Sequence, residues 1–177
     1  MFIPLKRKAS PTQEPDAVDL LLECHERIRR FTRLSTWLCD AHDAPELAVK
    51  ETADSILRYF TEALPKHRAD EELSIAPRLS TGRFPAELAA AAATMTKQHT
   101  DIEATIDALC PLWRAVSEDP AALAEHAPAM ERLVQRARGL WDPHLHLEET
   151  LVFPAVRARL SAPERAAVLR EMRERRR

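Results

Sequence analysis

The chain has 177 residues, with 26 Lys and Arg against 28 Asp and Glu and a formal net charge of −2. This length suits one domain with a substantial core, and the balanced charge excludes a chain that is basic throughout, as many nucleic-acid-binding proteins are. Only 2 Gly and 5% aromatic residues are present, which favours helices over strands. The three cysteines lack C-x-x-C spacing, which argues against a disulfide scaffold or a structural zinc site.

The N-terminal segment, residues 1–15, combines three prolines with a basic cluster. We expect it to be a loose arm. It has no apolar stretch long enough for export, and no segment of the sequence is apolar enough to span a membrane. We therefore expect a cytoplasmic, reduced protein with neither a membrane nor a nucleic acid as partner.

Apolar residues at helical spacing predict two long helices in the first half of the chain. The first covers residues 16–40, with His25 and Ile28 on one stripe. The second covers residues 46–78. Because proline lacks a backbone N–H and clashes with the preceding turn, we expect Pro65 to bend this helix.

The second half of the chain predicts another pair of helices. The third runs from Pro85 towards Pro111 or Trp113, after the clearest loop of the sequence. The fourth covers residues 121–160, and we expect Asp142-Pro143 to interrupt it. The apolar stripe expected in the core includes Leu140 and Leu151.

Four long helices with short links predict an all-α fold, an up-down-up-down four-helix bundle over residues 16–160. A short basic helix is expected at residues 161–177. Ser161 and Glu164 have the spacing of a capping box, which marks its start. Residues 165–177 hold six arginines against two glutamates, so the charge is polarised towards this end.

Two segments of the sequence repeat one another. Residues 67–79 and 144–156 both read H-x-x-x-E-E-x-x-aliphatic-x-P-x-aliphatic, and they lie 77 residues apart. Residues four apart on a helix share a face, so each segment presents an imidazole and a carboxylate together. A solvated ion pair would not require the aliphatic and proline positions to repeat as well.

The repeat extends to the first and third helices. His25 with Ile28 parallels His99 with Ile102, at an offset of 74 residues. The two halves of the chain thus read as two copies of one helical hairpin, an internal two-fold repeat. Each copy offers H-x-x-I on one helix and H-x-x-x-E-E on the next.

This set of residues predicts a metal site with nitrogen and oxygen ligands. Imidazole suits Fe, Zn, Cu and Ni, whereas an all-oxygen site for Mg or Ca is not implied. Two carboxylates can bridge two ions and hold them close together. The remaining coordination positions would stay open, as small ligands require, whereas structural sites are closed.

The pattern resembles the hemerythrin-like family, the HHE cation-binding domains, over nearly the whole chain. This resemblance implies a four-helix bundle around a non-haem di-iron centre with an oxo, hydroxo or water bridge, in which Zn or Mn could substitute for iron. It also implies that two glutamates, Glu71 and Glu148, bridge the ions. The implied ligands are His25, His67, Glu71, His99, His144 and Glu148.

One position departs from the oxygen-carrying members of that family. Those members have a further histidine one turn after the ligand of the third helix, and Glu103 stands there in this chain. The sequence therefore resembles the four-His, two-Glu variety, with Glu103 as a candidate seventh ligand. A more carboxylate-rich centre favours the ferric state, which gives weight to sensing, redox chemistry or iron handling over reversible oxygen carriage.

We expect a metal-binding protein that binds or senses a small ligand, such as O2, NO or peroxide, rather than an enzyme, and we assign no catalytic residue. The alternative is iron handling or a redox or repair role, as in related iron–sulfur cluster repair proteins. Those proteins typically carry a cysteine pair in an additional N-terminal domain, and residues 1–15 contain no cysteine. Glu72 and Glu149 should lie behind the ligands or in solvent.

Overall fold

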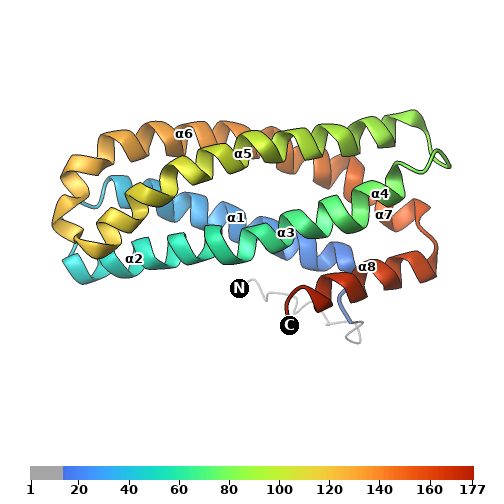
Figure 1. Cartoon of the computed structure of the whole chain (residues 1–177), viewed down its shortest axis with the longest axis horizontal. Coiled ribbons are helices and arrows are strands. Elements are labelled where there is room, and N and C mark those ends of the chain that lie inside the picture. The colour runs from blue at the N-terminus through green and yellow to red at the C-terminus, as the bar shows by residue number, and fades with distance from the viewer. Residues whose placement is uncertain (1–13) are drawn as a thin grey trace, which may run out of the picture.

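The computed structural model describes residues 14–177. Residues 1–13, most of the expected N-terminal arm, lie outside the described part. Within residues 14–177 every regular element is a helix, and four long helical segments run side by side along the molecule (Figure 1). The expected all-α bundle is confirmed.

The first segment is α1, Ala17–Cys39. Asp16 precedes it as the N-cap, and the side chains of Asp16 and Asp19 each accept a hydrogen bond from the other residue's backbone N–H. This reciprocal cap satisfies two N–H groups that the first turn leaves unpaired. Helix α1 therefore begins and ends within one residue of the expected bounds.

The second segment runs without a break from Glu46 to Leu79, but its winding changes along its length. A π-helical turn lies just before Pro65, where the sequence predicts a bend. A second π-helical turn precedes Pro77. The elements are α2 (Glu46–Arg58), η1 (Tyr59–Ala63), α3 (Leu64–Asp70), η2 (Glu71–Ile75) and α4 (Ala76–Leu79).

The third segment is longer than the sequence predicts. Helix α5, Ala86–Glu118, passes through Pro111 instead of ending near it. Leu109 and Trp113 flank this proline and are each 1% exposed. Their burial against the neighbouring helices outweighs the one backbone hydrogen bond that the proline removes.

The fourth segment likewise passes through a proline. The interruption expected at Asp142-Pro143 is wrong, because α6 continues through Pro143 and the winding changes only at Glu148. The buried side chains of Trp141 and Leu145 anchor this stretch in the core. The elements are the 3-10 turn η3 (Pro120–Ala122), α6 (Leu123–Leu147), η4 (Glu148–Val152) and α7 (Phe153–Arg159).

Each of the three π-helical turns ends two residues before a proline. The backbone N–H of Ala76 donates to the carbonyl of Glu71, five residues back, and that of Phe153 donates to Glu148 in the same way. A π turn accommodates one more residue than an α turn, so it shifts which side chains face the core. Leu151, expected in the core, is consequently 37% exposed, while Val152 is fully buried.

A short helix closes one end of the bundle. Helix α8, Ala162–Glu174, begins with the expected capping box of Ser161 and Glu164. It folds back beneath the ends of α1 and α3 (Figure 1). Val168 and Met172 bury completely against the bundle.

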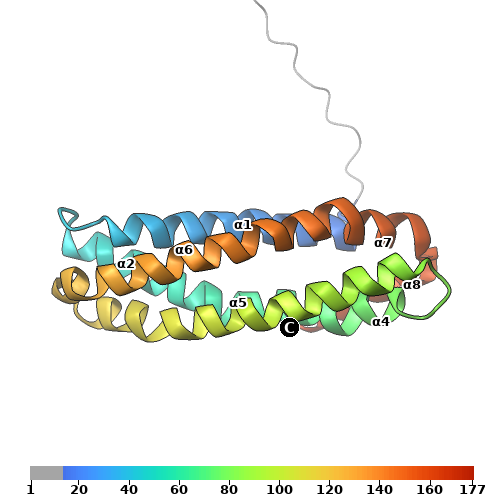
Figure 2. The same ribbon diagram turned by 90° about the horizontal axis from the view of Figure 1, so that it is seen from above.

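Helices α1 and α5 each pack against both α2 and α6, so each long helix has two long neighbours around one core. Figure 2 shows these helices running along the same direction. Apolar side chains fill the interior in two clusters. One is centred on Trp113 and Trp141, and the other contains Met95, Phe153 and the inner face of α8. The polar layer described below lies between them. None of the helices in residues 14–177 combines the length and apolar character needed to cross a membrane.

Candidate metal centre

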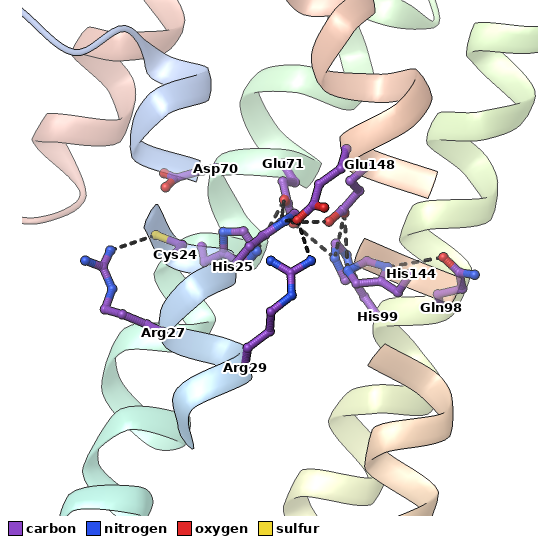
Figure 3. Close-up of polar contacts among 12 residues, drawn as sticks. Cys24, His25, Arg27, Arg29, Asp70, Glu71, Gln98, His99, His144 and Glu148 are labelled. Carbon is purple, nitrogen blue, oxygen red and sulfur yellow. Dashed lines mark hydrogen bonds and ion pairs between the residues drawn. The ribbon is translucent and has the colours of Figure 1, made fainter. Parts of the chain in front are cut away.

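Four histidines and two glutamates from all four long segments meet in the middle of the bundle. Figure 3 shows five of them, with His25, His99 and His144 around Glu71 and Glu148. Each of the six side chains is at most 4% exposed. Both glutamates are the first residue of a π-helical turn, and each follows its histidine by four residues. The residues are His25 of α1, His67 of α3, Glu71 of η2, His99 of α5, His144 of α6 and Glu148 of η4.

The two oxygens of Glu71 face different histidines. Oε1 lies 3.3 Å from Nε2 of His67, and Oε2 lies 3.2 Å from Nε2 of His99. Because these histidines come from opposite copies of the repeat, the carboxylate spans the centre.

Glu148 repeats this arrangement. Its Oε2 lies 3.0 Å from Nε2 of His25, and its Oε1 lies 3.2 Å from Nε2 of His144. Two groups of four side chains result, and both glutamates belong to both groups. The groups are His25, His67, Glu71, Glu148 and Glu71, His99, His144, Glu148.

Although these nitrogens and oxygens lie 3.0–3.3 Å apart, none of the inward-facing atoms makes a hydrogen bond of suitable geometry among the described residues. This holds for Nε2 of all four histidines and for both oxygens of Glu71 and of Glu148. A buried polar atom without a partner costs about 1–3 kcal/mol, so eight of them at one point call for a further group. Imidazole nitrogens and carboxylate oxygens are ligands for transition-metal cations, and the residues present fit such ions.

The burial of these groups also shifts their pKa values. Burial, followed by the neighbouring Glu71, raises the pKa of Glu148 to about 8. Burial and then Asp70 raise the pKa of Glu71 well above its usual value. Burial, followed by His99, lowers the pKa of His144 to about 3. Without a bound ion, the protein therefore disfavours the charged forms of these glutamates and of His144. Bound cations would stabilise the glutamates as carboxylates.

Three of the histidines are held from behind through Nδ1. His25 Nδ1 lies 2.7 Å from Oε1 of Glu149, and His99 Nδ1 lies 2.9 Å from Oε1 of Glu72. His144 Nδ1 contacts Oε1 of Gln98 at 3.1 Å. Such contacts orient a metal-binding imidazole with Nε2 towards the ion.

The sequence profile of the family described as "Hemerythrin HHE cation binding domain" matches residues 16–156 and, in a second match, residues 90–177. The chain belongs to this hemerythrin family. An uncharacterized protein of Haemophilus influenzae is 30% identical over 140 residues, which cover 77% of this chain and 76% of that protein. The second match starts within α5, the first long helix of the second hairpin.

Glu103, which the sequence offers as a candidate seventh ligand, lies outside both groups. Its carboxylate pairs with Arg68, and its side chain is 54% exposed. Arg68 also donates from Nε to Glu72 at 2.9 Å. Arg68 thus links Glu103 to the carboxylate that contacts His99.

The sequence did not identify the arginines and the glutamine behind the centre. Arg29 donates from Nη2 to Glu149 at 2.7 Å, and Gln98 contacts His144. Helical spacing could have indicated Arg29, because it follows His25 by four residues and so lies on the same face of the helix. His42 and His146, which the repeat does not include, are exposed.

A cavity of about 230 Å³ adjoins the centre between the second and third segments. It reaches His67 of one group and His99 of the other. Much of its wall is apolar and it includes Phe60 and Trp141, while Arg68 and Glu103 also line it. The space suits a small molecule.

Proposed function

We propose that this protein is a non-haem di-iron protein that binds or senses a small ligand such as O2, NO or peroxide. The observation that carries the proposal is the pair of four-residue groups that share Glu71 and Glu148. Each group offers two imidazoles and two carboxylate oxygens, a donor set that suits iron. Zinc or manganese could occupy the same donors.

Bound iron would supply reversible one-electron chemistry and open coordination positions for a small molecule. The residues of the chain would hold the two ions through His25 and His67 on one side and His99 and His144 on the other. Glu71 and Glu148 would bridge them. Glu72, Glu149 and Gln98 would keep hydrogen on the Nδ1 atoms of the histidines that they contact, which leaves Nε2 free to bind.

The cavity beside His67 and His99 supports a small ligand as the partner. A ligand in this cavity would lie beside one histidine of each group. The apolar part of the wall, including Phe60, Ile106 and Trp141, would limit water at the centre. We do not propose reversible oxygen carriage, because Glu103 replaces the additional histidine of the carriers and pairs with Arg68.

The test is titration of the reduced, iron-loaded protein with O2, NO and peroxide, followed by absorption spectroscopy. A ligand binder gives a stoichiometric spectral change with at least one of the three. Continuous consumption of the ligand would instead indicate an enzyme. An iron-loaded protein whose spectrum responds to none of them contradicts the proposed role, while leaving the metal centre itself intact.

A further inference from the structure

His67 differs from the other three histidines of the centre. Within residues 14–177 its Nδ1 has no hydrogen-bond partner, although the side chain is only 3% exposed. Its counterpart in the repeat, His144, contacts Gln98 through Nδ1. One of the four imidazoles therefore has a free, buried hydrogen-bonding atom behind the centre.

The internal repeat explains why this partner is missing. Gln98 immediately precedes His99, and Cys24 immediately precedes His25, so the two residues occupy equivalent positions. The thiol of Cys24 accepts a hydrogen bond from Nη2 of Arg27 at 3.0 Å (Figure 3). Cysteine is shorter than glutamine and offers no amide oxygen, so the His67 side lacks the contact that Gln98 provides on the other side.

A second cavity, of about 330 Å³, lies on the His67 side. Its wall contains three cationic side chains and one carboxylate. In the described part of the chain, neither Arg27 nor Lys66 has a carboxylate oxygen within 4.0 Å. The lining residues are Cys24, Arg27, Tyr59, Glu62, Ala63, Lys66, His67 and Arg176.

We propose that this second cavity binds a small oxyanion, a carboxylate or a phosphate. One oxygen would accept the hydrogen of His67 Nδ1 and so replace the missing amide of the repeat. Arg27 and Lys66 would donate to the remaining oxygens, because neither forms an ion pair with a carboxylate among the described residues, Glu62 of the same wall included. Arg176 contributes less, since its guanidinium also pairs with Asp70.

The proposal rests on the proposed function in one respect. A metal ion on Nε2 of His67 fixes the hydrogen on Nδ1, which makes that atom a donor. An anion that accepts this hydrogen increases the basicity of the imidazole, as carboxylates behind metal-binding histidines do. The bound oxyanion would therefore regulate the centre through His67, from a cavity separate from the apolar one.

The first test measures binding of inorganic phosphate, and separately of acetate, by calorimetry, with metal-loaded and metal-free protein. The double variant Arg27→Gln/Lys66→Gln should bind about tenfold or more weakly, because two charged donors are lost. The control Arg33→Gln/Lys97→Gln removes the same charges from exposed positions and should bind as the parent does. Comparison of the two probes shows whether phosphate or carboxylate is preferred.

The second test uses the repeat itself. Cys24→Gln introduces the residue type that stands at position 98 in the other half of the repeat. Its amide can contact Nδ1 of His67 and occupy the cavity. It should abolish oxyanion binding while keeping the metal content and the helical circular dichroism of the parent. If this variant loses its fold, Arg27→Gln/Lys66→Gln still tests the site.

Three results would overturn the proposal. The parent protein could bind neither probe, which would mean that water alone occupies the cavity. Binding could persist undiminished in Arg27→Gln/Lys66→Gln, which would place the anion elsewhere, for example on the metal ions. Cys24→Gln could remain folded and bind as the parent does. Metal content is measured first, so failure to load metal counts against the proposed function alone.

Discussion

The Nδ1 nitrogen of His25 lies 2.7 Å from Oε1 of Glu149, and the same oxygen accepts a hydrogen bond from Arg29. The repeat provides an equivalent contact between His99 and Glu72, in which Arg68 supports the carboxylate. Partial burial by itself raises the pKa of Glu149. The hydrogen bonds from His25 and Arg29 lower it by more, so the pKa of Glu149 lies below its usual value. The carboxylate therefore stays charged behind the imidazole.

We predict that Glu149→Gln lowers metal affinity by about 10- to 100-fold, because the imidazole of His25 loses a charged acceptor. Competition with a chelator measures the change. Glu26→Gln is the matched control, since Glu26 also pairs with Arg29 but its side chain is 72% exposed. Equal affinities for Glu149→Gln and the parent would show that this contact does not support the centre.

Glu103→Gln should leave the metal content unchanged. The Glu103 carboxylate pairs with Arg68 and lies outside both groups, so its loss affects the wall of the cavity and not the ligand set. Elemental analysis of the purified variant measures this. A lower metal-to-protein ratio would instead place Glu103 among the ligands, as the sequence allowed.

The stability of the metal-free protein should depend on pH in a specific direction. Glu148 has a pKa of about 8 in the folded protein against an ordinary value of 4.5, so above pH 4.5 folding binds an additional proton. His144, with a pKa of about 3 against 6.5, has the opposite effect, but only below pH 6.5. Between pH 6.5 and about 8 His144 has no further effect, and Glu71, whose pKa is also raised, acts in the same direction as Glu148. Stability must therefore fall as pH rises.

Thermal unfolding in the presence of a chelator measures this dependence. The melting temperature of the metal-free protein should fall from pH 6.5 to 8, while that of the metal-loaded protein should not show this fall, because bound cations keep the carboxylates deprotonated. A metal-free protein that becomes more stable across this window would contradict the raised pKa of Glu148, and with it the burial of this carboxyl group without a neighbouring cation.

The C-terminal arginines neutralise a buried carboxylate next to the centre. Asp70 is fully buried and lies 2.8 Å from Nη1 of Arg175 and 2.5 Å from Nη2 of Arg176. A chain that ends at Glu174 leaves Asp70 without these cations. We expect it to lose about 3–5 kcal/mol of stability, the usual effect of removing one side of a buried ion pair.

Urea unfolding measures this loss. The control is a chain that ends at Arg176 and keeps both cations, and it should unfold as the parent does. Asp70→Asn in the shorter chain should restore part of the stability, since it removes the uncompensated charge. A shorter chain as stable as the parent would show that solvent already screens Asp70.

The doubled sequence pattern was sufficient to predict the bundle and to identify six residues that the fold brings together. His67 and Glu71 are close in sequence, so helical spacing alone places them on one face. The continuation of α5 through Pro111 could not be predicted, because it depends on packing against helices that are distant in sequence. The same holds for α6 at Pro143. Proline signals a break only where no such packing opposes it.

The contacts around the centre could not be predicted from the sequence either. The spacing of Glu72 and Glu149 predicts only that they lie off the helix face that carries the ligands. Their contacts with His99 and His25 depend on how the two hairpins pack against each other. The pairing of Arg175 with Asp70 joins residues 105 positions apart. The arginine run at residues 173–177 did not indicate this contact, because a charge run is usually a solvated tail.

The central claim is that His67 and His144 belong to a centre for two metal ions, and the metal-to-protein ratio of anaerobically purified protein tests it most directly. Elemental analysis should give about two iron ions per chain for the parent and for His42→Ala/His146→Ala, whose histidines are exposed. His67→Ala/His144→Ala should bind none while keeping its helical circular dichroism. A folded parent protein without bound iron, or a double variant that still binds two ions, would contradict the account.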